Sequence, residues 1–287
     1  MTFKSFLQQI QILSLDVVAG SFASFIMAWK ILNMQAPAIL FIIIPLCVWI
    51  VYTTDHLIDG IKLKESAIAF RHRFHYAKQF HLIAFVLFLC FMALLLSFLY
   101  LPREIHYFGL LMGMFIMLYL SLVYVYGKMK RIFIPKEFVI ALVYTAGIWG
   151  APVLLSTQVL GNAEIMIIAE FLLLAFGNTI LLSYFEYKQD SDSGQVSFSI
   201  QYGLGFTRIF LITLFVLLIA LGTIGVLLFD QKLISLAFLI FSVMAAIMLW
   251  MILHPASFYK HKMYKWLIES VFLLPALILL DGKMISI

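Results

Sequence analysis

Long apolar runs separated by short polar segments make up almost the whole chain. About nine of these runs approach the roughly 20 residues that a helix needs to cross a bilayer core. They fall at residues 15–32, 37–55, 80–101, 106–126, 137–156, 164–185, 207–229, 233–253 and 266–281. Because the runs are uniformly apolar and do not alternate with polar residues, they predict transmembrane helices and not the strands of a barrel.

The composition supports a lipid-embedded protein. Of the 287 residues, 64% are hydrophobic and 11% are charged, and the mean hydropathy is +1.09. Soluble proteins carry about 25% charged residues, so we expect an all-α integral membrane protein with one polytopic domain over residues 1–287. Asp16 interrupts the first run and no small-residue cleavage site follows, which favours a retained span over a signal peptide. Cys47 and Cys90 lie in apolar runs and are expected to pack without forming a disulfide.

Basic residues are distributed unevenly between the two sets of connecting segments. If the N-terminus is cytoplasmic, 15 of the 19 Lys and Arg residues fall on the cytoplasmic side. This bias predicts a cytoplasmic N-terminus and, with nine spans, a C-terminus outside. The net charge of +5 therefore reflects membrane topology and gives no reason to expect nucleic-acid binding. From the simple architecture and the lack of a transit segment we expect a bacterial plasma membrane.

Two pairs of acidic residues end two of the predicted spans. Asp55 and Asp59 lie four positions apart at the end of the second span, and Glu186 and Asp190 repeat that spacing at the end of the sixth, with Asp192 close behind. Residues four apart share one face of a helix. Because the second and sixth spans run in the same direction, both pairs are predicted at the cytoplasmic membrane face.

Carboxylates gathered at one membrane face would repel one another unless divalent cations lay between them. Mg²⁺ takes oxygen ligands and is commonly held by one or two carboxylates plus the phosphates of a substrate. Basic side chains of the same loops can bind the remaining phosphate charge; these are Lys62, Lys64, Arg71, Arg73, Lys128, Lys130, Arg131 and Lys188. A diphosphate whose tail lies among apolar helices indicates an isoprenoid diphosphate.

The first pair resembles a motif of the UbiA superfamily of membrane-embedded prenyltransferases, whose members have nine transmembrane helices and aspartate-rich motifs after the second and the sixth. The family's first motif reads N-D-x-x-D-x-x-x-D. Asp55 and Asp59 match its last two acids, whereas Val51 stands at its Asn and Tyr52 at its first Asp.

The second pair is similar to the family's second motif, D-x-x-D-x-x-x-D-x-x-x-G-x-x-T. Glu186 and Asp190 match its middle and last acids. Gly194 stands at the Gly and Ser197 at the Thr, whereas Ser183 replaces the first acid.

A third stretch, "YGKMKR", is similar to the family's Y-S-x-x-[KR]-[KR] after the fourth helix and gives Tyr126, Lys130 and Arg131. The resemblance implies a UbiA-like bundle that moves an isoprenyl group from a polyprenyl diphosphate to a membrane-soluble acceptor, such as an aromatic compound or a quinone or lipid precursor. It also implies that the diphosphate is bound by these three residues together with Lys188 and Arg71.

The resemblance further implies the metal site. Asp55, Asp59, Glu186 and Asp190 are expected to be the catalytic acids and to hold Mg²⁺, with Asp192 as a further candidate ligand. The metal would neutralise charge on the departing diphosphate before the acceptor captures the allylic cation. Residues 60–78 are a candidate lid that keeps water out, and aromatic faces in the cavity would stabilise the cation.

The departures from the motifs leave other functions open. Val51 removes a polar group near the metal ligands, and such losses cost about 10–100-fold in metal affinity or activity. Together with Ser183 it makes a non-catalytic protein that binds a prenyl lipid, or a membrane scaffold, a credible alternative. A transporter is less favoured, because its charges would lie near the bilayer midplane beside broken helices.

Several polar residues have simpler interpretations than catalysis. His72 and His75 suit the lipid–water interface better than a metal site, because the spacing places no third ligand. Asp16 and Asn178 lie at membrane depth, where polar groups are often functional. Asp16 could equally reach the interface, and Asn178 could bridge two helices.

Overall fold

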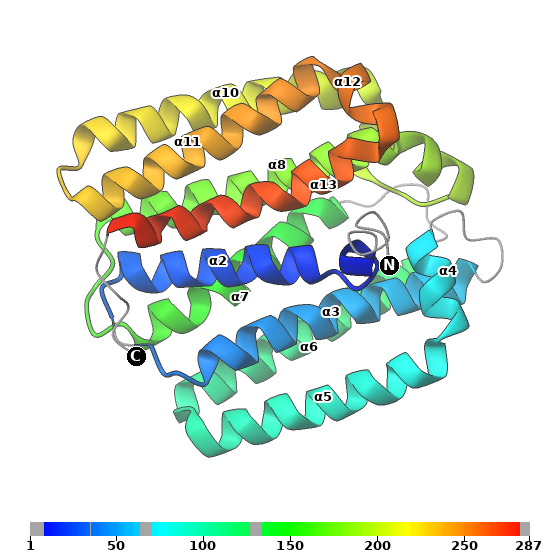
Figure 1. The fold of residues 1–287 in the computed structure, drawn as a ribbon, viewed down its shortest axis with the longest axis horizontal. Helices are drawn as coiled ribbons and strands as arrows, with labels where there is room; N and C mark the ends of the chain where they lie inside the picture. Colours follow the sequence, from blue (N-terminus) through cyan, green and yellow to red (C-terminus); the bar gives the residue numbers. More distant parts are fainter. Residues whose placement is uncertain (1–8, 35, 64–69, 127–133, 282–287) are drawn as a thin grey trace. The chain divides into compact units, whose positions relative to one another are not determined.

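The structure is a computed structural model, and the part of the chain that it describes is built from helices, with no β-strand (Figure 1). The described residues are 9–34, 36–63, 70–126 and 134–281. Contacts between helices group the chain into two compact units, each of which is described by itself. The first unit comprises residues 1–22 and 37–125, and the second comprises residues 23–36 and 126–287.

Four helices form most of the first unit: α3 (Leu40–Leu63), α4 (Phe70–Ala77), α5 (Gln79–Tyr100) and α6 (Arg103–Tyr126). The long helix α5 packs along α3, and the short helix α4 contacts both. Trp49 of α3 and Phe85 of α5 meet edge to face with 5.5 Å between their ring centroids. Because α4 packs on α3, it lies against the helix that carries the first acidic pair.

Helix α2 (Leu15–Ile31) begins in the first unit and ends in the second. At its start, the Oδ1 atom of Asp16 accepts a hydrogen bond from the backbone N–H of Val17 at 3.0 Å. At its end, Lys30 donates to the carbonyl of Ile278 at 3.4 Å. Asp16 therefore serves one of the backbone amides that a helix N-terminus leaves without a partner.

The second unit contains five long helical segments, joined by short helices. The long segments are α7 (Lys136–Leu155), α8 (Asn162–Ser193), α10 (Leu204–Leu228), α11 (Lys232–Leu253) and α13 (Met263–Ser270), which continues as the 3₁₀ helix η3 (Val271–Asp281). The short connecting helices are α9 (Phe198–Tyr202), α12 (Pro255–Tyr259) and η2 (Lys260–Lys262).

Aromatic rings fill the core of the second unit around Phe171 of α8, which is almost fully buried. Its centroid lies 5.7 Å from Tyr144 of α7, 5.8 Å from Phe241 of α11 and 5.9 Å from Phe272 of η3. The pair α10 and α11 packs especially closely at Gly225, where an added Cβ atom would lie 2.5 Å from the ring of Phe238. The core thus ties α8, the helix of the second acidic pair, to its neighbours on several sides.

The protein is an all-α integral membrane protein, as the sequence predicts. Eight helices of the described residues are long and apolar enough to cross a membrane. α5 and α6 carry many exposed apolar side chains, including Phe80, Phe98 and Met114. Contact of such a surface with water is unfavourable, whereas contact with lipid chains is not. The 17 residues of α2 span about 26 Å, a little less than the roughly 30 Å of a bilayer core, so α2 is the candidate for the ninth span.

Two helices continue past the ends of the predicted spans; the extension of α3 carries Asp59, and the extension of α8 carries Glu186 and Asp190. α3 runs to Leu63 and α8 runs to Ser193, so all four acids lie within helices. With 32 residues α8 is about 48 Å long, longer than a bilayer core is thick. Its last turns therefore lie beyond the apolar part of the helix.

Candidate diphosphate site

The first acidic pair lies on the last turns of α3 in the first unit. The side chains of Asp55 and Asp59 are 52% and 29% exposed, so solvent and solutes can reach both carboxylates. Their spacing of four residues places them on one face of the helix. The pair is thus accessible and pre-positioned by α3 alone.

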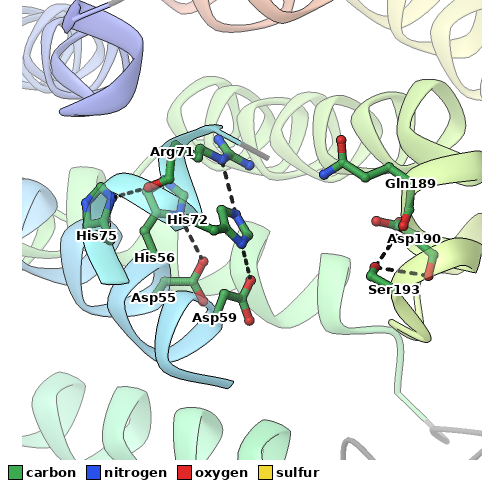
Figure 2. A network of polar contacts seen from close by, with 9 residues as sticks. All are labelled: Asp55, His56, Asp59, Arg71, His72, His75, Gln189, Asp190 and Ser193. Atoms are coloured by element: carbon green, nitrogen blue, oxygen red, sulfur yellow. Dashed lines mark hydrogen bonds and ion pairs between the residues drawn. The ribbon is translucent and has the colours of Figure 1, made fainter. Parts of the chain in front are cut away.

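Two histidines of the first unit, His56 and His72, lie beside these carboxylates, and a third, His75, lies next to His56 (Figure 2). The Nδ1 atom of His56 is 3.8 Å from Asp55 Oδ2, and the Nδ1 atom of His72 is 4.0 Å from Asp59 Oδ2. The His72 and His56 rings stack with 5.7 Å between their centroids, and His75 meets His56 edge to face at 5.4 Å. All three imidazoles are buried; His56 belongs to α3, whereas His72 and His75 come from α4, which packs on this side of the pair.

Close packing at Gly60 makes this arrangement possible. A Cβ atom added to Gly60 would lie 2.8 Å from the carbonyl oxygen of His72 and 3.2 Å from the backbone nitrogen of Tyr76. On α4 itself, His75 Nδ1 donates to the carbonyl of Arg71 at 2.8 Å, and Arg71 Nε donates to His72 Nε2 at 3.4 Å. Burial lowers the pKa of His75 below its ordinary value, which favours the neutral ring.

The second acidic pair lies on the last turns of α8 in the second unit, and it is much less exposed than the first. Glu186 is 8% exposed and Asp190 is 7% exposed. The helix ends at Ser193 and is capped by Gly194, whose φ of 66° lies in the left-handed region that glycine adopts readily. Ser193 Oγ donates to the Gln189 carbonyl at 2.8 Å and to the Asp190 carbonyl at 3.3 Å, which helps to close this helix end (Figure 2).

Glu186 has a charged partner within its own unit. The ammonium of Lys265 on α13 forms an ion pair with Glu186 Oε1, and the Lys265 side chain is 20% exposed. The neighbouring residues reinforce this contact, because the ring of Tyr264 stacks on that of Phe185 at 4.9 Å with an interplanar angle of 6°. Lys265 belongs to neither of the two acidic motifs nor to the basic motif after the fourth predicted span.

The segment that follows the second pair is anchored by two buried side chains. Glu137 of α7 accepts a hydrogen bond from the backbone N–H of Phe198 at 2.8 Å. Ser183, which stands at the first acid of the family motif, accepts from the backbone N–H of Ser199 at 3.1 Å, and the two serine hydroxyls lie 2.7 Å apart. In this chain Ser183 therefore fixes the loop after α8.

The proposed diphosphate-binding residues fall partly outside the described residues. Lys130 and Arg131 lie outside them, and Tyr126 is the last residue of α6. Lys188 is exposed on α8, and Arg71 is engaged with His72. The third candidate metal ligand of the second motif, Asp192, is exposed on the last turn of α8.

The donor chemistry fits Mg²⁺ that is bound together with a phosphate. Among the described residues, no three or more His, Cys, Asp or Glu side chains gather into a preformed metal site. Each acidic pair supplies two carboxylates, and Mg²⁺ is commonly held by one or two carboxylates while water and substrate phosphates complete its shell. Asp55 and Asp59 are accessible for this role, whereas Glu186 is already paired with Lys265.

Comparison with known proteins gives a likeness of fold. No protein-family model matches the sequence, and no curated protein matches it. The structure is similar to a solved structure of a digeranylgeranylglyceryl phosphate synthase in membranes, with a TM-score of 0.56 and 18% sequence identity. The match covers 96% of this chain and 97% of that chain. Both chains thus share one helical architecture over nearly their full lengths, in agreement with the bundle that the motifs predict.

Proposed function

We propose that this protein is a membrane prenyltransferase that moves an isoprenyl group from a polyprenyl diphosphate to an acceptor dissolved in the bilayer. Aromatic compounds and quinone or lipid precursors are the candidate acceptors. The observation that carries the proposal is the likeness of fold, over nearly the whole chain, to a digeranylgeranylglyceryl phosphate synthase. The acidic pairs at the ends of α3 and α8 support it.

In this proposal Asp55, Asp59, Glu186 and Asp190 hold Mg²⁺, with Asp192 as a further ligand. When bound, Mg²⁺ supplies the positive charge that stabilises the departing diphosphate. The spacing of four residues within each pair supports a shared role, because it presents both carboxylates on one helix face. Through the metal these carboxylates would orient the diphosphate head, and the apolar helices accommodate its tail.

Basic and aromatic side chains complete the proposed site. Lys188, Arg71, Tyr126, Lys130 and Arg131 bind the diphosphate oxygens. Lysine and arginine are the usual phosphate-binding side chains, and an exposed lysine such as Lys188 is free to turn toward a ligand. Residues 60–78 are the proposed lid that excludes water from the reacting carbon; the described helix of this segment, α4, packs on α3 at Gly60, beside the first acidic pair.

The proposed orientation follows the basic residues. The N-terminus and the loops after α3 and α8 face the cytoplasm, because these loops belong to the set that holds most of the Lys and Arg residues. A bacterial plasma membrane is the proposed location. On this side a water-soluble diphosphate head meets the acidic pairs while its isoprenyl tail enters the bilayer.

Ligand-dependent thermal stability of the detergent-purified protein tests the proposal. A non-reactive prenyl diphosphate analogue at 100 times its dissociation constant should stabilise the protein by about 2.7 kcal/mol. We expect this stabilisation to require Mg²⁺ and to disappear in Asp55→Asn and in Asp190→Asn. Asp230→Asn is the matched control, because Asp230 is exposed between α10 and α11 and belongs to neither motif.

A non-catalytic prenyl-lipid-binding protein is the second candidate. It is favoured by Ser183, which stands at a motif acid and instead binds the Ser199 amide, and by the Lys265 partner of Glu186. The same experiment separates the two candidates. Stabilisation by the prenyl alcohol alone, with no added effect of the diphosphate or of Mg²⁺, would support the binding protein and reject the enzyme.

A further inference from the structure

Lys265 neutralises one of the two carboxylates of the second acidic pair. Its ammonium forms the ion pair with Glu186 Oε1, and the carboxylate side chain is only 9% exposed. A buried carboxylate is costly unless a cation or several hydrogen-bond donors compensate its charge. In the second unit as described, a positive charge beside this carboxylate comes from α13.

Aromatic packing holds Lys265 in reach of Glu186. Tyr264, the residue before Lys265, stacks on Phe185, the residue before Glu186, at 4.9 Å. Tyr259 adds an edge-to-face contact with the same Phe185 ring at 5.1 Å. Two consecutive residues of α13 thus meet two consecutive residues of α8. The backbone of α13 is fixed by apolar contacts that do not depend on the ion pair.

The lysine side chain itself remains adjustable. Its ammonium ends a flexible four-carbon chain that can change partners without movement of the backbone. The side chain is 20% exposed, in contrast to 9% for Glu186. The neighbours of Lys265 hold its backbone in place, and its ammonium is partly open to solvent. The ammonium can therefore exchange a carboxylate for a diphosphate, which carries more negative charge and is commonly bound by lysine.

We propose that Lys265 is a diphosphate-binding residue that forms an ion pair with Glu186 until a diphosphate binds. In the ligand-free protein it stands where a divalent cation would otherwise neutralise the second acidic pair. When a diphosphate head binds, the Lys265 ammonium exchanges Glu186 for a phosphate oxygen, and the released carboxylate would be available to hold the Mg²⁺ that accompanies the diphosphate. The identity of the ligand rests on the proposed function, whereas the role of counterion does not.

The role of counterion is tested without any diphosphate. Thermal stability is measured across a Mg²⁺ titration in wild type, Lys265→Met and the double variant Lys265→Met/Glu186→Gln. We expect Lys265→Met to be stabilised at Mg²⁺ concentrations at least about tenfold lower than wild type, because an exchange of partners worth 1.4 kcal/mol gives that factor. The double variant should lose this response. An unchanged Mg²⁺ response in Lys265→Met would overturn the role of counterion.

The phosphate-binding role is tested with a non-reactive prenyl diphosphate analogue and the matching prenyl alcohol. Lys265→Met should lose about ten- to a hundredfold in affinity for the diphosphate, the value of a charge-assisted hydrogen bond, and none for the alcohol. Lys265→Arg should restore most of the loss. Lys260→Met, which removes an exposed lysine from the neighbouring η2 helix, is the control and should bind both compounds as wild type does.

A second variant keeps the test valid if Lys265→Met is poorly folded. In Glu186→Gln the ammonium loses its ion pair, so in EDTA this variant should bind the diphosphate analogue several-fold more tightly than wild type. An equal gain in the double variant Lys265→Met/Glu186→Gln would show that the gain comes from the lost negative charge alone, and that result would overturn the inference. If wild type binds the alcohol and the diphosphate equally under all conditions, the proposed function fails, and the phosphate-binding role fails with it.

Discussion

His72 of α4 lies beside Asp59 of α3, with 4.0 Å between Nδ1 and Oδ2. The other ring nitrogen, Nε2, accepts the Nε–H group of Arg71 at 3.4 Å. A neutral imidazole that accepts at Nε2 carries its proton on Nδ1. His72 therefore turns an N–H group toward a carboxylate that we propose as a metal ligand, in the way that outer groups orient ligands at many metal sites.

Replacing His72 by Asn or by Gln tests the roles of its two ring nitrogens separately. Asn places its NH₂ group near the position of Nδ1, and Gln reaches the position of Nε2. We expect His72→Asn to preserve the Mg²⁺ concentration needed for binding of the diphosphate analogue, and His72→Gln to raise it about tenfold or more. The exposed His81 supplies the control variant, His81→Gln. Equal Mg²⁺ requirements in all four proteins would show that His72 only fills space.

Gly60 should not tolerate a side chain. In Gly60→Ala the new Cβ atom would meet backbone atoms of His72 and Tyr76 at 2.8 and 3.2 Å, and backbone cannot yield unless α4 shifts. We expect a loss of about 1–3 kcal/mol, as for other overpacked sites, and faster amide exchange over residues 70–77. In Gly113→Ala the added atom meets nothing within 4 Å, so this control should be neutral or slightly stabilising. Equal exchange in both variants would refute close packing at Gly60.

Acid should loosen α4 through His75. Burial is the main cause that lowers the pKa of His75, Arg71 lowers it further by repulsion, and the hydrogen bond to the Arg71 carbonyl opposes the shift. His56 of α3 faces the same ring. The unfolded state binds the proton of His75 more tightly than the folded state does. The contribution of His75 to stability is therefore complete above its ordinary pKa of 6.5 and decreases as the pH drops below that value.

Amide exchange of residues 70–77 between pH 7.5 and 5.5 measures this effect. His75→Asn keeps an N–H donor near the position of Nδ1 but does not titrate, so its exchange, corrected for intrinsic rates, should depend less on pH. His81→Asn, at an exposed position on α5, should behave as wild type. The same pH dependence in His75→Asn and wild type would assign the effect to another group.

The sequence predicted the helices well because each span is long and uniformly apolar. It placed the ends of α3 and α8 too early, because the last turns carry the polar residues that belong to the acidic pairs and so end the apolar signal. The spacing of Asp55 and Asp59, and of Glu186 and Asp190, already indicated that the helices continue. The short helices α4 and α9 carry no apolar run long enough to predict them.

The contacts around the acids could not be predicted in the same way. Lys265 is far from Glu186 in the sequence and looks like any lysine that anchors a loop at the membrane surface. Gly60 gives no sign of the backbone that approaches it. The two acidic pairs themselves were found because their chemistry requires a fixed spacing on one helix, whereas their partners come from other helices.

Glu137 should be required for the loop after the second acidic pair. It lies 61 positions before Phe198, is 3% exposed, and accepts the Phe198 N–H at 2.8 Å. In Glu137→Ala this buried N–H loses its acceptor, which costs about 1–3 kcal/mol, and amide exchange should rise at Phe198. Glu137→Gln keeps an oxygen acceptor and should lose less than half as much stability. The exposed Asp230 provides the control Asp230→Ala. If Glu137→Gln is as unstable as Glu137→Ala, the negative charge and not the hydrogen bond holds this loop.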